Sequence, residues 1–237
     1  MNRPLIKSSW IGEGALIVGS ILLALTAEAL WNNSQERAAE KELLATVYSE
    51  LLASKDDLQR EMGMHTGDLN AATKLLEYTT SQDMTVLPAE TAAWPFYLFS
   101  TTNLDTGALN GALASGQLDN VSNLQLKARL GAWPSVVAEF VEEEARAARF
   151  VDSIRPVVSP YIQTPRVMDA LGSESPLPEI ATAESIQFLK SIEGQNLASV
   201  RVSIESSAMR DAERLLNLIE ELLDLIETEL NLPPRNP

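Results

Sequence analysis

A single apolar stretch near the N-terminus constrains the fold more than any other part of this sequence. It covers residues 10–31, beginning at Trp10 and ending at Trp31, and the rest of the chain is acidic and polar. The two tryptophans are 21 residues apart. That spacing corresponds to about 31 Å along a helix, the separation of the two aromatic belts of a bilayer. We therefore expect residues 10–31 to form a transmembrane helix with Trp10 and Trp31 as interfacial anchors.

The uncharged centre of this stretch is short, because it covers only the 14 residues 14–27. Runs of that length also occur in the core helices of soluble proteins and in signal peptides. Glu13 and Glu28 bracket the run and would lie within about one turn of the two membrane interfaces, where a carboxylate can reach water at the headgroups. The tryptophan spacing and these flanking acids favour a membrane helix.

A cleaved signal peptide is the competing interpretation. Arg3 and Lys7 would supply its basic region, and residues 27–29 have the A-x-A form of a cleavage site. Helix-forming residues continue through that site without a turn-forming residue, so we favour an uncleaved anchor. The same two basic residues favour a cytoplasmic N-terminus, because Lys and Arg flanking a span tend to stay inside. We expect a single-pass protein of a bacterial inner membrane, with a periplasmic C-terminal domain.

One face of the membrane helix combines a carboxyl group with small side chains. At 100° per residue, Ser20, Ala24 and Ala27 lie within about 40° of Glu13, on the side that also carries Trp31. Small residues let a second membrane helix approach closely, and a carboxyl group there gains a partner for hydrogen bonding. The alternative is that Glu13 only marks the interface. The hypothesis is that this face contacts subunits of a membrane protein complex, or a second copy of the chain.

The membrane helix continues without a break into a long helix that we expect to end near residue 79. Apolar or nearly apolar residues recur along it at alternating spacings of three and four, which predicts a buried seam. Lys55 and His65 interrupt the series, and Gly63 and Gly67 suggest a bend. The seam comprises Leu44, Tyr48, Leu51, Leu58, Met62, Leu69, Ala72 and Leu76.

The remaining chain predicts more helices and almost no strand. Helical patterns cover residues 103–115, 125–154, 184–192 and 196–230, with a kink or restart expected at Pro134 and an end at Gly194. The fold class is therefore all-α, with the membrane helix continuous with a long helix that packs into an antiparallel, coiled-coil-like bundle. The expected organisation is a tail at residues 1–9, the membrane helix at 10–31, a helical extramembrane domain at 32–232 and a tail at 233–237.

Charge excludes one class of partner. The formal net charge is -15, and only Arg3 and Lys7 among the 18 basic residues precede residue 32. The domain after residue 32 is therefore strongly acidic and would repel the phosphates of a nucleic acid. We expect no nucleic-acid partner. The lipid bilayer is contacted through the membrane helix only.

Several segments together resemble an uncharacterised bacterial family of single-pass membrane proteins with a helical domain of unknown function. The resemblance starts with the basic N-terminus, Trp10, Glu13 and the apolar run at residues 17–25. It continues through Trp31-Asn32, residues 35–37, residues 42–44 and residues 113–118 to the leucine-rich last helix. It implies an uncleaved anchor and an all-helical domain. It carries over no activity and no site residue.

Motifs for chemistry are absent from the sequence. There is no cysteine and only one histidine, His65, which argues against a Ser-His triad and against His-rich zinc or di-iron sites. No phosphate-binding or dinucleotide-binding glycine motif occurs. We interpret His65 as a helix-surface residue and the run at residues 142–144 as a solvated face. We expect no catalytic residue, no metal ligand and no cofactor, and hence no enzyme.

Two function classes remain. The first is a structural or accessory subunit, which docks through its transmembrane helix on a larger membrane protein complex and braces it with a periplasmic helical domain. The second is a membrane-anchored sensor, or a helical module that binds a ligand or partner. A sensor normally has an effector across the membrane, and only nine residues precede Trp10. The accessory subunit is therefore the favoured prediction.

Overall fold

The computed structural model describes residues 8–82, 95–97, 99–102, 104, 106–162 and 182–233, with side chains described from residue 16 onward. These residues contain helices and no strand, which confirms the all-α prediction. Their helices are α1 (Ser8–Thr80), α3 (Gly107–Ser115), the 3-10 helix η1 (Gln117–Asn120), α4 (Leu124–Val158), α6 (Ala183–Leu189) and α7 (Ile192–Leu230).

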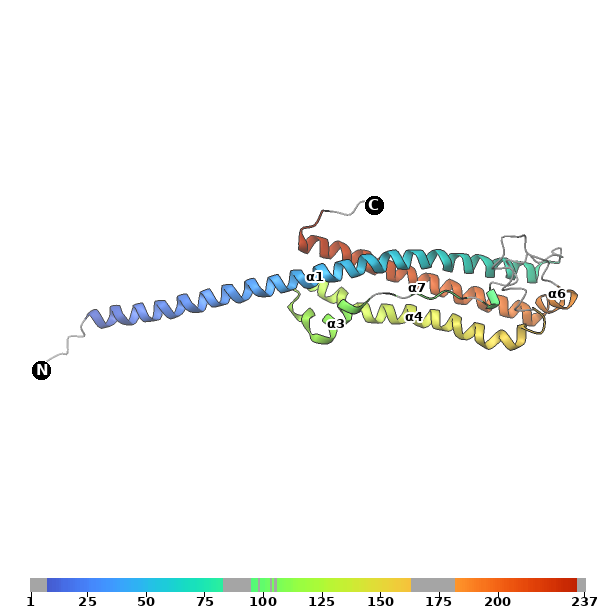
Figure 1. Ribbon diagram of the computed structural model, residues 1–237, viewed down its shortest axis with the longest axis horizontal. Helices are drawn as coiled ribbons and strands as arrows, with labels where there is room; N and C mark the ends of the chain where they lie inside the picture. The colour runs from blue at the N-terminus through green and yellow to red at the C-terminus, as the bar shows by residue number, and fades with distance from the viewer. Residues whose placement is uncertain are drawn as a thin grey trace.

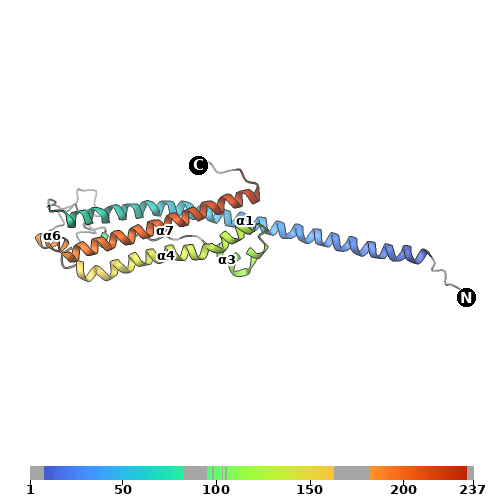
Figure 2. The same cartoon turned by 180° about the vertical axis from the view of Figure 1, so that it is seen from behind.

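Three long helices form an elongated bundle. Figure 1 shows α1 and α4 running in the same direction, with α7 antiparallel to both, and the view from behind in Figure 2 shows the same order. Contacts of α7 with α1 and with α4 dominate the packing of the bundle. Helix α7 therefore holds the other two long helices together. α3 and η1 lie at the end from which α1 projects, and α6 lies at the far end.

A segment of largely non-helical chain returns along the bundle between α1 and α4. This return segment is described at residues 95–97, 99–102, 104 and 106. Near the far end Tyr97 Oη donates to the carbonyl oxygen of Ile162 at 2.6 Å. At the other end Glu50 of α1 accepts from the backbone N–H groups of Ala108 and Leu109, both at 2.9 Å. Glu50 thus satisfies two of the orphan donors at the start of α3. This explains why α3 begins at Gly107 and not at residue 103.

Local side-chain capping determines where the later helices begin. Asn123 accepts from the N–H groups of Gln125 and Leu126 at the start of α4. Thr182 and Ser185 form a reciprocal capping box at the start of α6. Such caps satisfy helix N–H groups that have no partner within the helix.

The interior consists of two apolar clusters. The first cluster, next to the projecting end, is built around Leu51 of α1, Trp133 of α4 and Ile219 of α7. The second cluster, at the far end, contains Tyr78 and Val158. On each long helix, buried polar or charged side chains lie between the part that contributes to the first cluster and the part that contributes to the second.

Several expected breaks are absent. Helix α1 is unbroken at Gly63 and Gly67, and α4 continues through Pro134, so the expected restart at the proline is wrong. Leu130 and Trp133 are buried immediately before the proline, and this tertiary packing outweighs the loss of one helical hydrogen bond. The short helix expected at residues 184–192 ends at Leu189.

Gly194 lies in the first turn of α7 and does not end the preceding helix as expected. Ser191 caps α7 by accepting from the N–H of Gly194 at 3.2 Å. A Cβ atom at position 194 would lie 2.5 Å from the carbonyl oxygens of both Phe188 and Leu189. Only glycine permits this close approach between α6 and α7.

Gly194→Ala should therefore destabilise the protein by about 1–3 kcal/mol, because the added methyl group forces α6 away from α7. The measurement is the urea midpoint of the full chain in detergent, followed by circular dichroism. Gly131→Ala is the matched control, since a Cβ there would meet nothing within 4 Å. The control should be neutral or stabilising by up to about 1 kcal/mol. Equal midpoints for the two variants would contradict the prediction.

Candidate functional site

The N-terminal part of α1 projects alone from the bundle (Figure 1). Every described side chain from residue 16 to residue 39 is exposed. Within the described part of the chain, α1 is the one helix that is long and apolar enough to cross a membrane, and none of its apolar window is buried. The core helix of a soluble protein would bury such a window, whereas the large apolar side chains here are more than half exposed.

The unbroken helix brings the predicted partner face to one side of this projection. Ser20, Ala24, Ala27 and Trp31 are exposed, and Ser20 Oγ donates to the carbonyl oxygen of Leu16 at 2.5 Å. Trp10 and Glu13 lie in the same helix, but their side chains are outside the described residues. The role of this face in binding another helix stays a prediction.

A second candidate site lies inside the bundle, between the two apolar clusters. We call it the polar layer, and it consists of His65 and Asp68 of α1, Glu144 of α4, and Arg201 and Glu205 of α7. All five side chains are buried, with exposures between 0 and 4 %. Buried charges are rare unless they are paired. A layer of five, contributed by all three long helices, is therefore a specific feature of this fold.

His65 is at the centre of the polar layer. Its Nδ1 lies 3.3 Å from Glu205 Oε2, and its Nε2 lies 3.3 Å from Glu144 Oε1. Arg201 forms an ion pair with the other oxygen of Glu205, at 2.8 Å between Nη2 and Oε1. The histidine thus bridges carboxylates from two different helices.

The return segment closes the layer. Ser100 Oγ donates to Asp68 Oδ2 at 3.0 Å. Thr102 donates to Glu144 Oε1 from both its backbone N–H, at 2.8 Å, and its hydroxyl group, at 2.7 Å. The return segment therefore orients two carboxylates of the layer, those of Asp68 and Glu144.

The carboxylates alter the protonation of the histidine. Burial alone would lower the pKa of His65, but the hydrogen bonds and charges of Glu144 and Glu205 outweigh it and raise the pKa to about 9. Burial also lowers the pKa of Arg201, against the opposing charges of Glu205 and Asp68. Counted formally with protonated His65, two cations face three carboxylates. The layer then carries a buried charge of -1.

Two sequence-based interpretations are wrong at this site. His65 was expected on the helix surface and is 1 % exposed, and Glu144 was expected on a solvated face and is 4 % exposed. The periodicity contained a signal for both. Glu144 lies four residues after buried Phe140, and His65 lies seven residues after buried Leu58, so both occupy core positions of their helices.

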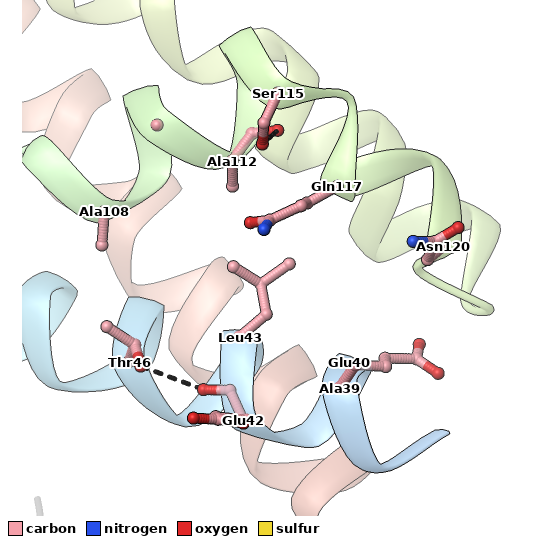
Figure 3. A pocket seen from close by; sticks show the side chains of 11 residues that line it. Ala39, Glu40, Glu42, Leu43, Thr46, Ala108, Ala112, Ser115, Gln117 and Asn120 are labelled. Carbon is pink, nitrogen blue, oxygen red and sulfur yellow. Dashed lines mark hydrogen bonds between the residues drawn. The ribbon is translucent and has the colours of Figure 1, made fainter. Parts of the chain in front are cut away.

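A pocket of about 700 Å³ lies between α1 and the α3–η1 unit, at the end from which α1 projects. Figure 3 shows Leu43 of α1 directed toward Ala112 and Gln117 across the pocket. Small side chains of α3, including Ala108, form one wall. Glu40 and Glu42 are the charged residues that line it, with no basic one among the described residues. The pocket therefore suits a neutral or cationic group and disfavours phosphate.

Comparisons with known proteins provide no assignment. No family model, no curated protein and no solved structure matches this chain. The functional argument therefore depends on the projecting helix, the polar layer and the pocket.

Proposed function

We propose that this protein is a single-pass accessory subunit of a bacterial inner membrane. Its N-terminus lies in the cytoplasm, residues 10–31 cross the membrane, and the helical bundle lies in the periplasm. Its transmembrane helix docks on a larger membrane protein complex, and the bundle braces that complex from outside.

One observation carries the proposal. Helix α1 passes without interruption from an exposed apolar segment into the core of the bundle. An exposed apolar stretch of that length is costly in water and is stabilised in a bilayer. Because no flexible joint intervenes, the orientation of the membrane helix and that of the bundle are coupled. Such coupling suits a brace.

The pocket supports the same arrangement. It lies at the end of the bundle from which α1 projects, and it begins at Ala39, eight residues after Trp31. A partner subunit held against the membrane helix would therefore reach it. Glu40 and Glu42 line the pocket, and their negative charge favours a basic juxtamembrane segment of that partner, with Glu40 also accepting from the backbone N–H and hydroxyl of Ser122.

The partner face can be tested directly. Glu13→Leu combined with Ser20→Leu should weaken association of the membrane helix by about tenfold, because close packing and an interhelical hydrogen bond are both lost. A two-hybrid membrane assay would measure this association. Val18→Leu with Ala29→Leu is the matched control, since both residues lie about 140–160° away from Glu13 around the helix. Equal association of the two double variants would contradict the hypothesis that this face binds another helix.

The accessory role needs a separate measurement. Gentle solubilisation of the full chain, followed by a native gel and mass spectrometry, should show it in a larger complex with defined subunits. Migration as a lone monomer would contradict the accessory role. It would favour the alternative, a membrane-anchored sensor or ligand-binding helical module.

A further inference from the structure

We propose that the polar layer is a binding site for one divalent transition-metal ion, with His65, Asp68 and Glu205 as its ligands and Zn²⁺ as the best-suited ion. Each of these residues offers one ligand atom, and the three atoms lie within 4.8 Å of one another. His65 and Asp68 are three residues apart on α1 and so share one face, and Glu205 approaches from α7. The site therefore joins the two helices with the most extensive mutual packing.

The separation of two of the ligand atoms is compatible with their binding one metal ion. His65 Nδ1 and Glu205 Oε2 are 3.3 Å apart. Ligand atoms about 2.0–2.1 Å from a tetrahedral zinc ion are separated by about 3.3–3.4 Å. The Asp68 ligand atom lies within 4.8 Å of the other two, and movement of its carboxylate toward them would complete three corners of a tetrahedron.

Each proposed ligand already has an outer partner of the kind that metal ligands require. The remaining ring nitrogen of His65 lies 3.3 Å from Glu144 Oε1. This is the carboxylate–histidine–metal arrangement, which fixes the tautomer and increases the basicity of the ligand. Arg201 pairs with Glu205 Oε1, the oxygen that does not face His65, and Ser100 donates to Asp68 Oδ2. The three ligands are thus oriented before an ion binds.

Charge favours the same assignment. The charged groups that face the site are His65 and Asp68 from α1, Glu144 from α4, and Arg201 and Glu205 from α7. With protonated His65 they sum formally to -1. With neutral His65, as in a metal ligand, they sum to -2, and a divalent ion brings the sum to zero. A neutral cluster is less costly to bury than a charged one.

The ligand types select the class of ion. One imidazole with two carboxylates suits Zn²⁺, whereas Ca²⁺ and Mg²⁺ prefer oxygen ligands alone. Three protein ligands leave the fourth tetrahedral position to water.

The test is a titration of the metal-free full chain, without a histidine tag, in detergent. Isothermal titration with ZnCl₂ should show one ion per chain with a micromolar or lower Kd. Asp68→Asn and Glu205→Gln should each weaken binding at least about 100-fold, and Glu144→Gln should weaken it about 10–100-fold. Glu142→Gln, on the exposed side of α4, should bind as the unchanged chain does.

A measurement on the unchanged chain keeps the test decisive if a variant fails to fold. His65 is the single histidine of the chain. An imidazole signature in the X-ray absorption spectrum of the zinc-loaded protein therefore identifies His65 as a ligand. Binding of less than half an equivalent, an absent imidazole signature, or unchanged affinity in Asp68→Asn and Glu205→Gln would each overturn the proposal. None of these results bears on membrane docking.

Discussion

Arg201→Met should destabilise the metal-free protein by about 3–5 kcal/mol, which is the largest effect we expect from any single substitution. Methionine has a similar length and fills the space, so the loss arises from charge. Arg201 is fully buried and forms an ion pair with Glu205. Its removal leaves three buried carboxylates opposite His65 alone, and an uncompensated buried charge is strongly destabilising.

Urea unfolding of the full chain in detergent, with a chelator present, would measure this loss. Arg146→Met is the matched control, because Arg146 lies on α4 with half of its side chain exposed and pairs with Glu143 at the surface. Exposed ion pairs contribute about 0–1 kcal/mol. If Arg201→Met were no more destabilising than Arg146→Met, the buried arginine would not stabilise the layer.

The stability of the metal-free protein should fall as the pH rises from about 6.5 to 9.5. The folded chain raises the pKa of His65 from 6.5 to about 9. The folded state therefore binds more protons than the unfolded state in this range. The stabilisation is fully present below the unfolded pKa and is lost as the pH passes the folded one, with an upper limit of about 3 kcal/mol.

Urea midpoints at intervals of pH, with a chelator present, would follow this change. His65→Gln removes the titrating group and keeps a polar side chain, so its stability should vary much less with pH over the same range. An equally steep decline in His65→Gln would assign the pH dependence to other groups.

The sequence predicts much of the fold because helical periodicity is a local signal. The seam correctly identified Leu44, Leu51, Leu58 and Ala72 as buried residues of α1. The apolar periodicity did not predict the polar layer, because a polar or charged residue at a seam position breaks the apolar pattern. Whether such a residue is buried depends on partners distant in sequence, and His65 lies 79 residues from Glu144 and 140 from Glu205. The sequence also did not predict the position of the return segment, because its polar residues follow no periodic pattern.

The position of the polar layer has a consequence for how far the bundle extends above the membrane. Heptad spacing of apolar residues does not by itself distinguish one alignment of two helices from another shifted by two turns. Such a shift would move Arg201 and Glu205 away from His65. The buried charged side chains would then face apolar residues of the neighbouring helix. The buried charges therefore select one vertical alignment of the helices. In the proposed membrane orientation, the far end of α1 lies roughly 70 Å above the outer interface at Trp31, and the buried charges fix the height of α7 relative to it.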